Sequence, residues 1–448
     1  MLLLGWPTRL DNQPSDNLRT NEDNEIEERV LSKRQMHHLG QSLQYDGDGH
    51  LLTIAPTGSG KGIGVIIPNL LHYAWPTIVI DPKGENLLVT ARYRKVELGH
   101  RILLLDPFKA VKDEYLDKYG LKRGRLNPMD LFGLSQATTF DLDAQVIASL
   151  LAGDDASLED PFWDKSAKRV LAGLLLDELN ESKKEIRSPK LRNVIDIIFG
   201  DDPISQIRAI CQKKDLSLFI KASLNGGLIA HADSPGMREG IIATAQSYLS
   251  IFQSPELLES LEESTINLAD IKNKDDYTLY IIIPPTKLHS HSSLLQTWVG
   301  VLMHAVMERD SRPEFSTLFM LDECANLGRM QVLRKAVTLL RGYGLQVWMF
   351  FQDLSQMESL FGTESNTIIN NCGVLQTFGI GRMSAARPIA HIVGHYPAKT
   401  LLELDPSQQM LSLSTGKAFI VRKLCFFRDQ AFIGRDEPNP MIPDRLRI

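Results

Sequence analysis

The chain has 448 residues, of which 43% are hydrophobic and 23% are charged, and its formal net charge is −6. This length allows two or three domains with a sizeable core, and the composition is that of an ordinary soluble globular protein. The negative charge excludes nucleic-acid binding through an overall basic surface, so any contact with DNA would use local patches or a channel lining.

The cysteines and the apolar runs indicate the cellular compartment of the chain. Its four cysteines lie far apart and form no Cys-x-x-Cys pair, which suits a reducing cytosol better than a disulfide framework or a zinc site. No apolar run approaches the ~20 residues that span a bilayer, and residues 1–4 are too short for the core of a signal peptide. The chain as given is therefore expected to be soluble.

The first part of the chain divides into an arm and an α/β region. Residues 1–35 are polar and acid-rich, and we expect an extended arm or a peripheral helix. Residues 36–140 alternate apolar runs with helical stretches, which predicts the first part of a nucleotide-binding domain. The runs TIVIDPKGE and RILLLDPF end in Asp-Pro, as expected of buried parallel strands whose carboxyl ends carry loops.

A glycine-rich motif lies in this region, within the sequence IAPTGSGKGIGVIIPNLL. A short strand is predicted over residues 51–54, and a helix from Gly62 to about Trp75. A strand, a glycine-rich turn, a lysine and a helix build a phosphate-binding loop, in which backbone N–H groups and the helix N-terminus surround an anion. We expect ATP with Mg²⁺ to be bound here, by Thr57, Gly58, Ser59, Gly60, Lys61 and Gly62.

This loop departs from the usual pattern G-x-x-x-x-G-K-[ST] at two positions. Ala55 stands in place of the first glycine, and Gly62 follows the lysine. The second departure matters because a hydroxyl there normally helps to hold Mg²⁺. A simple glycine turn is the alternative interpretation, but the predicted strand and helix on either side favour a nucleotide site.

Between residues 141 and 267 the pattern changes. Asp-Pro and Ser-Pro pairs recur, and each is typical of a helix N-cap followed by proline at the first helical position. No convincing period-two run intervenes, so we expect an all-α domain inserted into the nucleotide-binding domain. The pairs are Asp160-Pro161, Asp202-Pro203, Ser234-Pro235 and Ser254-Pro255.

Residues 268–448 are predicted to be the second part of the nucleotide-binding domain. The runs YTLYIIIPP, STLFMLDE, LQVWMFFQ and VLQTFGI are spaced for helical crossovers, and KAFIVRK is a candidate edge strand. One apolar run ends in Asp322, the predicted metal-side carboxylate, followed by Glu323, predicted to activate water for attack on the γ-phosphate. The alternative is an acidic pair facing solvent, which the phosphate loop upstream disfavours.

Two further residues are candidates for the same chemistry. Gln352 closes the run LQVWMFFQ and could sense the γ-phosphate or position water; the alternative is simple capping of a strand end. Arg341 lies on the turn before that strand and could act as a finger toward the nucleotide of a neighbouring subunit. Its alternative is a solvated charge at a helix C-terminus.

Taken in order, the motifs APTGSGKG, VIDPKGE, DPFWDKSA, LDECANLG, LRGYG and FFQD resemble the motor domains of type IV secretion coupling proteins, the TraG/TraD-like conjugation ATPases. The resemblance covers roughly residues 45–435. It implies a RecA-like P-loop NTPase with an all-α domain, working as a homo-hexamer at the cytoplasmic face of the bacterial inner membrane. Such a motor links relaxase-bound DNA or effector proteins to the secretion channel, with its ATPases and inner-membrane components.

The resemblance also implies a role for each candidate residue. Residues 57–62 would bind nucleotide, Asp322 and Glu323 would form the Walker B pair, Gln352 would be the sensor and Arg341 the trans-acting finger. A glycine after the loop lysine is familiar in this family. The family's N-terminal membrane domain has no counterpart here, so we expect either a soluble portion of such a protein or a relative without that domain.

Two other functions stay open. A soluble DNA pump of the FtsK/HerA type is disfavoured by DPKGE and by the place of the insertion. A non-hydrolysing docking platform, which uses nucleotide only to set its shape and recruits cargo through the helical domain, is compatible with the metal ligand missing at Gly62. DNA-stimulated phosphate release would distinguish a motor from a platform.

Overall fold

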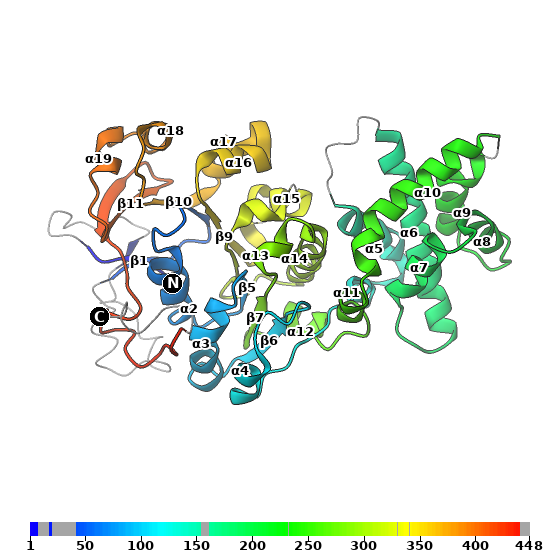
Figure 1. The fold of residues 1–448 in the computed structure, drawn as a ribbon, viewed down its shortest axis with the longest axis horizontal. Helices are drawn as coiled ribbons and strands as arrows, with labels where there is room; N and C mark the ends of the chain where they lie inside the picture. The colour runs from blue at the N-terminus through cyan, green and yellow to red at the C-terminus, as the bar shows by residue number, and fades with distance from the viewer. Residues whose placement is uncertain are drawn as a thin grey trace.

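The structure is a computed structural model. It describes residues 1–7, 18–19, 42–153, 161–231, 233–328, 330–339 and 341–439. Figure 1 shows two lobes side by side, an α/β lobe that contains the N-terminus and a helical lobe formed by the described residues between 140 and 260. Within the described ranges, no helix has both the length and the apolar character needed to cross a membrane.

The α/β lobe is built on a nine-stranded sheet with the order β12-β11-β10-β4-β9-β8-β5-β7-β6. Neighbouring strands from β10 to β6 pair in parallel, whereas β11 and β12 are antiparallel to their neighbours. The strands are β4 His50–Ile54, β5 Thr77–Ile80, β6 Arg101–Leu105, β7 Tyr277–Ile281, β8 Thr317–Leu321, β9 Leu345–Phe351, β10 Cys372–Thr377, β11 Gln408–Leu413 and β12 Ala418–Arg422.

The apolar runs of the sequence became the buried strands of this sheet. Every residue of β5, β7, β8 and β9 is buried, because crossover helices cover parallel strands on both faces. KAFIVRK is an edge strand, as predicted, because β12 ends the sheet. Strand β11 was not predicted. Its second residue, Gln409, is a buried polar side chain that interrupts the apolar pattern and accepts a hydrogen bond from Gln376 Nε2 at 2.6 Å.

Helices connect the parallel strands at the spacing expected from the sequence. The helices of the α/β lobe are α2 Ile67–Leu70, α3 Glu85–Val96, α4 Asp113–Lys118, α12 Leu268–Asn273, α13 Pro285–Leu288, α14 Ser292–Met307, α15 Gln331–Leu339, α16 Leu354–Phe361, α17 Ser365–Asn370, α18 Met383–Val393 and α19 Ala398–Leu402. Shorter turns are the π-helix η2 Gly62–Ile66 and the 3₁₀ turns η3 Pro128–Gly133, η7 Cys324–Leu327, η8 Arg341–Tyr343 and η9 Gly362–Glu364.

The helix after the glycine-rich loop is shorter than predicted. It starts at Gly62 as η2 but ends with α2 at Leu70, not near Trp75. The buried guanidinium of Arg94 explains this end, because it donates to the carbonyl oxygens of Leu70 at 2.7 Å, Tyr73 at 2.8 Å and Trp75 at 3.1 Å. These carbonyls therefore find donors without a further helical turn.

The expected N-terminal arm lies mostly outside the described residues. Its first residues differ from the prediction, because Leu2–Gly5 is a buried strand, β1, rather than part of a polar arm. It pairs with β3 (Leu43–Tyr45), which also pairs with β2 (Leu18–Arg19). The side chain of Asn69 bonds both the N–H and the carbonyl of Leu3, at 2.7 and 3.0 Å, so the apolar start of the chain docks on α2.

The helical lobe contains helices and no strand among its described residues. It comprises α5 Phe140–Ala152, α6 Pro161–Lys184, α7 Leu191–Ile198, α8 Pro203–Cys211, α9 Leu218–Gly227, α10 Pro235–Leu249 and α11 Pro255–Ser260, with short turns η4 Ala137–Thr139, η5 Ile229–His231 and η6 Ser250–Gln253. Four helices begin at the prolines of the predicted caps. Asp202 makes the expected cap bond, to Ser205 N at 3.0 Å, whereas Ser234 and Ser254 make none and Asp160 is not described.

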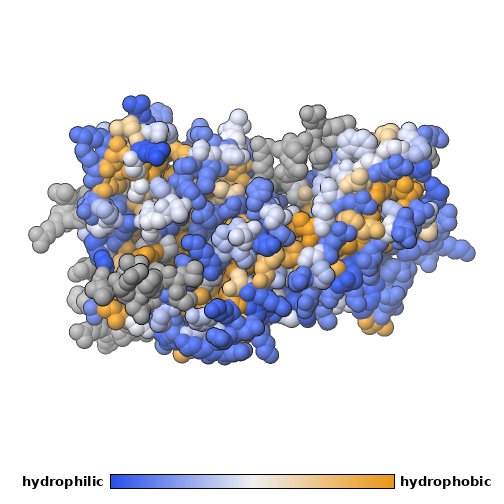
Figure 2. Space-filling model, in the orientation of Figure 1, coloured by the Kyte–Doolittle hydropathy of each residue, from blue (hydrophilic) through white to orange (hydrophobic). Residues whose placement is uncertain are grey.

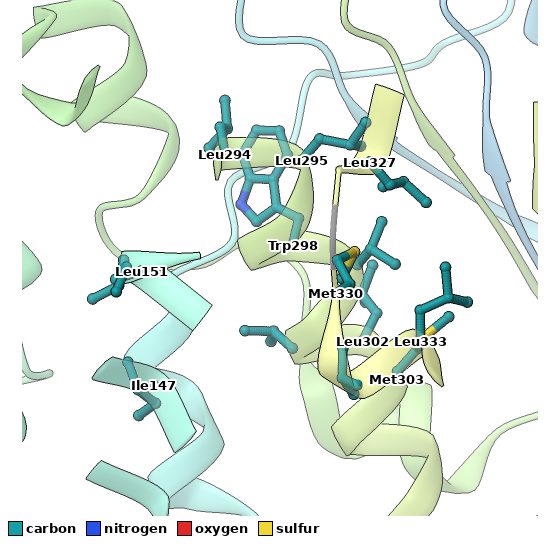
Figure 3. Packing of buried hydrophobic residues seen from close by; sticks show 14 of the residues in the cluster. Ile147, Leu151, Leu294, Leu295, Trp298, Leu302, Met303, Leu327, Met330 and Leu333 are labelled. Atoms are coloured by element: carbon teal, nitrogen blue, oxygen red, sulfur yellow. The ribbon is translucent and has the colours of Figure 1, made fainter. Parts of the chain in front are cut away.

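An apolar core joins the two lobes. Figure 3 shows α14 between α5 of the helical lobe and the segment that follows β8, with Trp298 near the centre. The indole of Trp298 is fully buried and donates to Leu126 O at 3.1 Å. Hydrophilic residues cover most of the face drawn in Figure 2, and hydrophobic residues show in several patches, one of them near the junction of the lobes. The helical lobe therefore packs directly on the helix that leads into β8.

Replacing Arg94 with methionine is expected to lower the free energy of unfolding by about 3 kcal/mol. The variant leaves buried carbonyls without a donor, and each such group costs roughly 1–3 kcal/mol. Urea denaturation followed by circular dichroism measures the change. Lys95→Met is the control, since Lys95 is exposed on the same helix, and it should cost less than about 0.5 kcal/mol. An Arg94→Met variant as stable as the wild type would contradict this account.

Candidate nucleotide-binding site

A cavity of about 530 Å³ opens at the carboxyl ends of β4, β9, β8 and β5. It brings together the glycine-rich loop, the acidic pair and the strand-end glutamine, which are far apart in the sequence. Its lining includes the predicted residues Thr57, Gly58, Gly60, Lys61, Gly62, Asp322, Glu323 and Gln352, and also Asp81, Lys83 and Glu85.

The loop takes its shape from two glycines and a lysine. Gly58 and Gly60 have φ of 78° and 95°, in the region that favours glycine, so the backbone can curl without strain. Lys61 Nζ donates to Ala55 O at 2.9 Å, across the mouth of the loop. Ser59, also predicted to bind nucleotide, donates its hydroxyl to Pro56 O at 2.6 Å and so closes the turn. Hydrogen bonds within the segment from Ala55 to Lys61 therefore help to shape the loop.

The acidic pair follows β8 directly. Asp322 is half-buried. Desolvation and the charge of Glu323 together raise the pKa of its carboxyl to about 6, and the charge of Lys61 opposes this rise. Glu323 has φ of 57°, a left-handed conformation that is strained for a residue other than glycine. Such strain concentrates at functional sites. The left-handed conformation of Glu323 turns the backbone at the end of β8, where both carboxylates line the cavity.

Gln352 contacts Glu323 directly. Its Nε2 atom donates to both carboxylate oxygens, at 2.9 and 3.2 Å, although 29 residues separate the two in the sequence. Its own backbone N–H donates to Gln356 Oε1 at 2.9 Å. The side chain of Gln352 therefore contacts a carboxylate of the cavity, and its role as a sensor stays a prediction.

Asp81 is a cavity residue that the sequence analysis did not select. It follows β5, and its Oδ2 atom accepts the N–H of Leu87 at 2.8 Å. Burial, together with the nearby charge of Asp322, raises the pKa of this carboxyl to about 7, against the hydrogen bonds that it accepts from the backbone. The signal was present in VIDPKGE, where the strand-end aspartate occupies the same position as Asp322 does after β8. Two carboxyls from neighbouring strands thus face one cavity.

Arg341 is not brought to this cavity. It lies in η8, just before the start of β9, whereas Gln352 follows the end of the same strand. Because a strand rises ~3.3 Å per residue, the seven residues of β9 put roughly 23 Å between Arg341 and Gln352. Arg341 thus lies by the amino ends of the strands, whereas the cavity opens at their carboxyl ends. Its backbone position leaves it out of reach of the phosphate loop of its own chain.

A parallel sheet with a phosphate loop and a strand-end acidic pair at one edge, joined to a helical domain, defines a P-loop NTPase of RecA-like fold. The family described as "Type IV secretory system Conjugative DNA transfer" matches residues 14–401, and the chain belongs to this family. The fold class predicted from the sequence is thereby confirmed, whereas the predicted domain boundaries stay a prediction.

Curated relatives and a solved structure agree with this assignment. The conjugal transfer protein TraG of Escherichia coli is 25% identical over 370 residues, covering 79% of this chain and 56% of TraG. The protein VirD4 of Rhizobium radiobacter is 23% identical over 367 residues, covering 81% and 50%. The chain thus spans about half the length of these relatives. The plasmid coupling protein TrwB in complex with ADP and Mg²⁺ shares the fold, with a TM-score of 0.63, 17% identity and 84% of each chain covered.

Replacing Lys61 with alanine is expected to weaken binding of ATP at least about tenfold, since one hydrogen bond from a charged group is worth about 1.5–3 kcal/mol. The fold should remain, because the side chain is only half-buried; the free energy of unfolding should change by less than about 1 kcal/mol. Isothermal titration with ATP and urea denaturation measure the two quantities. Lys112→Ala, at an exposed lysine, is the control, and unchanged ATP affinity in Lys61→Ala would refute the phosphate-loop assignment.

Proposed function

We propose that this chain is the ATP-driven motor of a coupling protein, which recruits DNA or protein substrates and feeds them to a type IV secretion channel. The observation that carries the proposal is the bond between Gln352 and Glu323 beside the phosphate loop, since an oriented carboxylate near Lys61 is what ATP hydrolysis requires. Membership of the conjugative DNA-transfer family supports the coupling role.

The binding step uses the loop and the two aspartates that follow β5 and β8. Lys61 and the backbone of residues 57–62 would hold the phosphates of ATP. Mg²⁺ is usually bound by one or two carboxylates together with substrate phosphates, and Asp322 and Asp81 fit this pattern. When bound, the metal would neutralise charge on the phosphates. Gly62 contributes no hydroxyl, so these carboxyls would have to supply the protein oxygens around the ion.

The hydrolytic step depends on the acidic pair and the glutamine. Glu323 would accept a proton from the attacking water, and Gln352 would keep the carboxylate in position through its amide. A γ-phosphoryl oxygen can accept a hydrogen bond from the same amide. Because this amide carries two hydrogens, Gln352 would donate one to the nucleotide and keep the other on Glu323, and so would sense ATP without releasing the carboxylate.

Assembly and partners follow from the same proposal. The working state would be a homo-hexamer at the cytoplasmic side of the bacterial inner membrane, in contact with the channel's ATPases and inner-membrane components. The helical lobe would carry cargo or accessory contacts, because every candidate residue for chemistry lies in the α/β lobe. Relaxases, effector proteins and single- or double-stranded DNA are the expected cargo classes.

Two alternatives make different predictions. A non-hydrolysing docking platform has no need of an oriented base, so the contact between Gln352 and Glu323 favours hydrolysis. A soluble FtsK/HerA-like DNA pump would also hydrolyse ATP, but family membership favours the coupling role. Phosphate release from the purified chain, measured with and without DNA, separates a motor from a platform, because a motor is stimulated by DNA and a platform is inactive.

Glu323→Gln is expected to bind ATP with the affinity of the wild type and to hydrolyse it at least ~10²-fold more slowly, the usual scale for loss of a general base. Titration calorimetry and a phosphate-release assay measure the two steps separately. Glu314→Gln is the matched control, since Glu314 is exposed before the same strand, and should hydrolyse normally. Near-normal turnover in Glu323→Gln would remove Glu323 from the catalytic role.

Arg341 is expected to act across a subunit boundary, because the length of β9 separates it from the phosphate loop of its own chain. An arginine supplied in trans is worth about 10³–10⁵ in rate in GTPases. Arg341→Ala and Glu323→Gln should each be nearly inactive alone and should regain activity on mixing, since a mixed ring can pair an intact arginine with an intact site.

The control for mixing is the double variant Arg341→Ala/Glu323→Gln combined with Glu323→Gln, which has no intact site and should stay inactive. Specific activity of the wild type should also rise with protein concentration or with DNA that nucleates a ring. An Arg341→Ala variant with wild-type turnover, or a rate independent of concentration, would leave this arginine a charge at a helix end.

A further inference from the structure

We infer that Lys423 is a positioning residue for the phosphate loop. Its ammonium group orients the peptide between Ser59 and Gly60, so that the Gly60 N–H is presented to the phosphates. The inference rests on the proposed nucleotide site, and it adds a residue from the other end of the chain, 364 positions away.

The contact is made by the segment that leaves β12. Lys423 directly follows this edge strand, and its own N–H donates to Ser407 O at 2.7 Å, which anchors it beside β11. Its Nζ atom lies 3.0 Å from Ser59 O. The ammonium also lies 4.7 Å from the centre of the Phe378 ring, within cation–π range. Both contacts hold the charge against the outer side of the loop.

The next residue of this segment approaches the loop just as closely. A Cβ atom added to Gly64 would lie 3.1 Å from Leu424 O. Residues 423–424 therefore cross over the loop and the first turn of η2 at backbone distance. Lys423 is half-buried there, and burial lowers the pKa of its ammonium group. A lysine placed this tightly has little freedom to leave the Ser59 carbonyl.

Because a trans peptide is planar, the contact of Lys423 with Ser59 O also fixes the direction of the Gly60 N–H. In a trans peptide the carbonyl and the following N–H point in opposite directions, and the described part of the chain has no cis peptide. Because the Ser59 carbonyl points to Lys423, the Gly60 N–H points away from it, and Gly60 lines the cavity. Gly60 has φ of 95°, and a glycine adopts positive and negative φ about equally. Local sterics therefore do not choose the direction of this N–H, and Lys423 does.

Lys423→Met removes the ammonium and keeps most of the stem. It is expected to weaken binding of both ADP and ATP about tenfold, the scale of one hydrogen bond to a charged group, and to raise KM by the same factor while kcat changes less than about threefold. Lys423→Arg, which can still donate to Ser59 O, should restore most of the affinity. The control is Lys417→Met, an exposed lysine in the turn between β11 and β12, which should bind as the wild type does.

The structural readout is a crystal structure of Lys423→Met without nucleotide, in which the peptide of Ser59 and Gly60 should lose its single orientation. A variant that binds ADP normally with this peptide unchanged overturns the inference. So does loss of ATP affinity alone, which would mean that Lys423 contacts the γ-phosphate itself, and so does an arginine variant as weak as methionine. If the wild type binds no nucleotide, the proposed function fails, and the peptide orientation alone then decides the role of Lys423.

Discussion

The parallel register of four neighbouring strands is the constraint on which the candidate site depends. Ile54, the last residue of β4, pairs with Phe351 at the end of β9. Leu321, the last residue of β8, pairs with Met349 of β9 and with Ile80, the last residue of β5. Each of these strands ends at the same edge of the sheet, so the loops that follow them meet. Ligands of open parallel sheets bind at this edge for the same reason.

Buried polar side chains keep the phosphate-loop strand in this register. The Trp348 indole of β9 donates to Thr53 Oγ1 of β4 at 2.9 Å, and the same hydroxyl donates to Gln376 Oε1 of β10 at 2.7 Å. Gln376 in turn donates to Gln409 of β11 at 2.6 Å. A slip of one residue would turn these side chains to the other face and leave buried polar groups unpaired. Strand β4 is therefore fixed to both of its neighbours, and the loop after it is fixed relative to Gln352.

The parts of this arrangement that a short stretch of sequence encodes could be predicted. Continuous apolar runs identified the parallel strands, and the strand-end positions of Asp322 and Gln352 identified two segments of the cavity. Contacts between distant segments were missed, because no local pattern records them. Gln409 breaks the apolar pattern of β11, and only the structure shows that it accepts a hydrogen bond from Gln376 of the neighbouring strand. Lys423 looks in the sequence like any charged residue after an edge strand, and only the structure shows that its ammonium group contacts Ser59 O. The roles of the site residues stay predictions, since geometry places groups and does not measure rates.

The segment after the acidic pair links the candidate site to the helical lobe through α14. It continues as η7, whose last residue, Leu327, accepts a hydrogen bond from the buried Gln296 of α14 at 2.6 Å. Helix α14 packs on α5 of the helical lobe, where Gly153 leaves room for the Gln296 side chain: an added Cβ would lie 2.8 Å from its Oε1 atom. A shift of η7 would therefore break this bond or move α14 against the helical lobe. Because protein cores are close-packed, small displacements at such a junction are transmitted rather than absorbed. The residues proposed to sense and hydrolyse ATP thus lie at one end of a packed connection to the lobe proposed to carry cargo, whereas Arg341, which precedes β9, is the residue proposed to act on a neighbouring subunit.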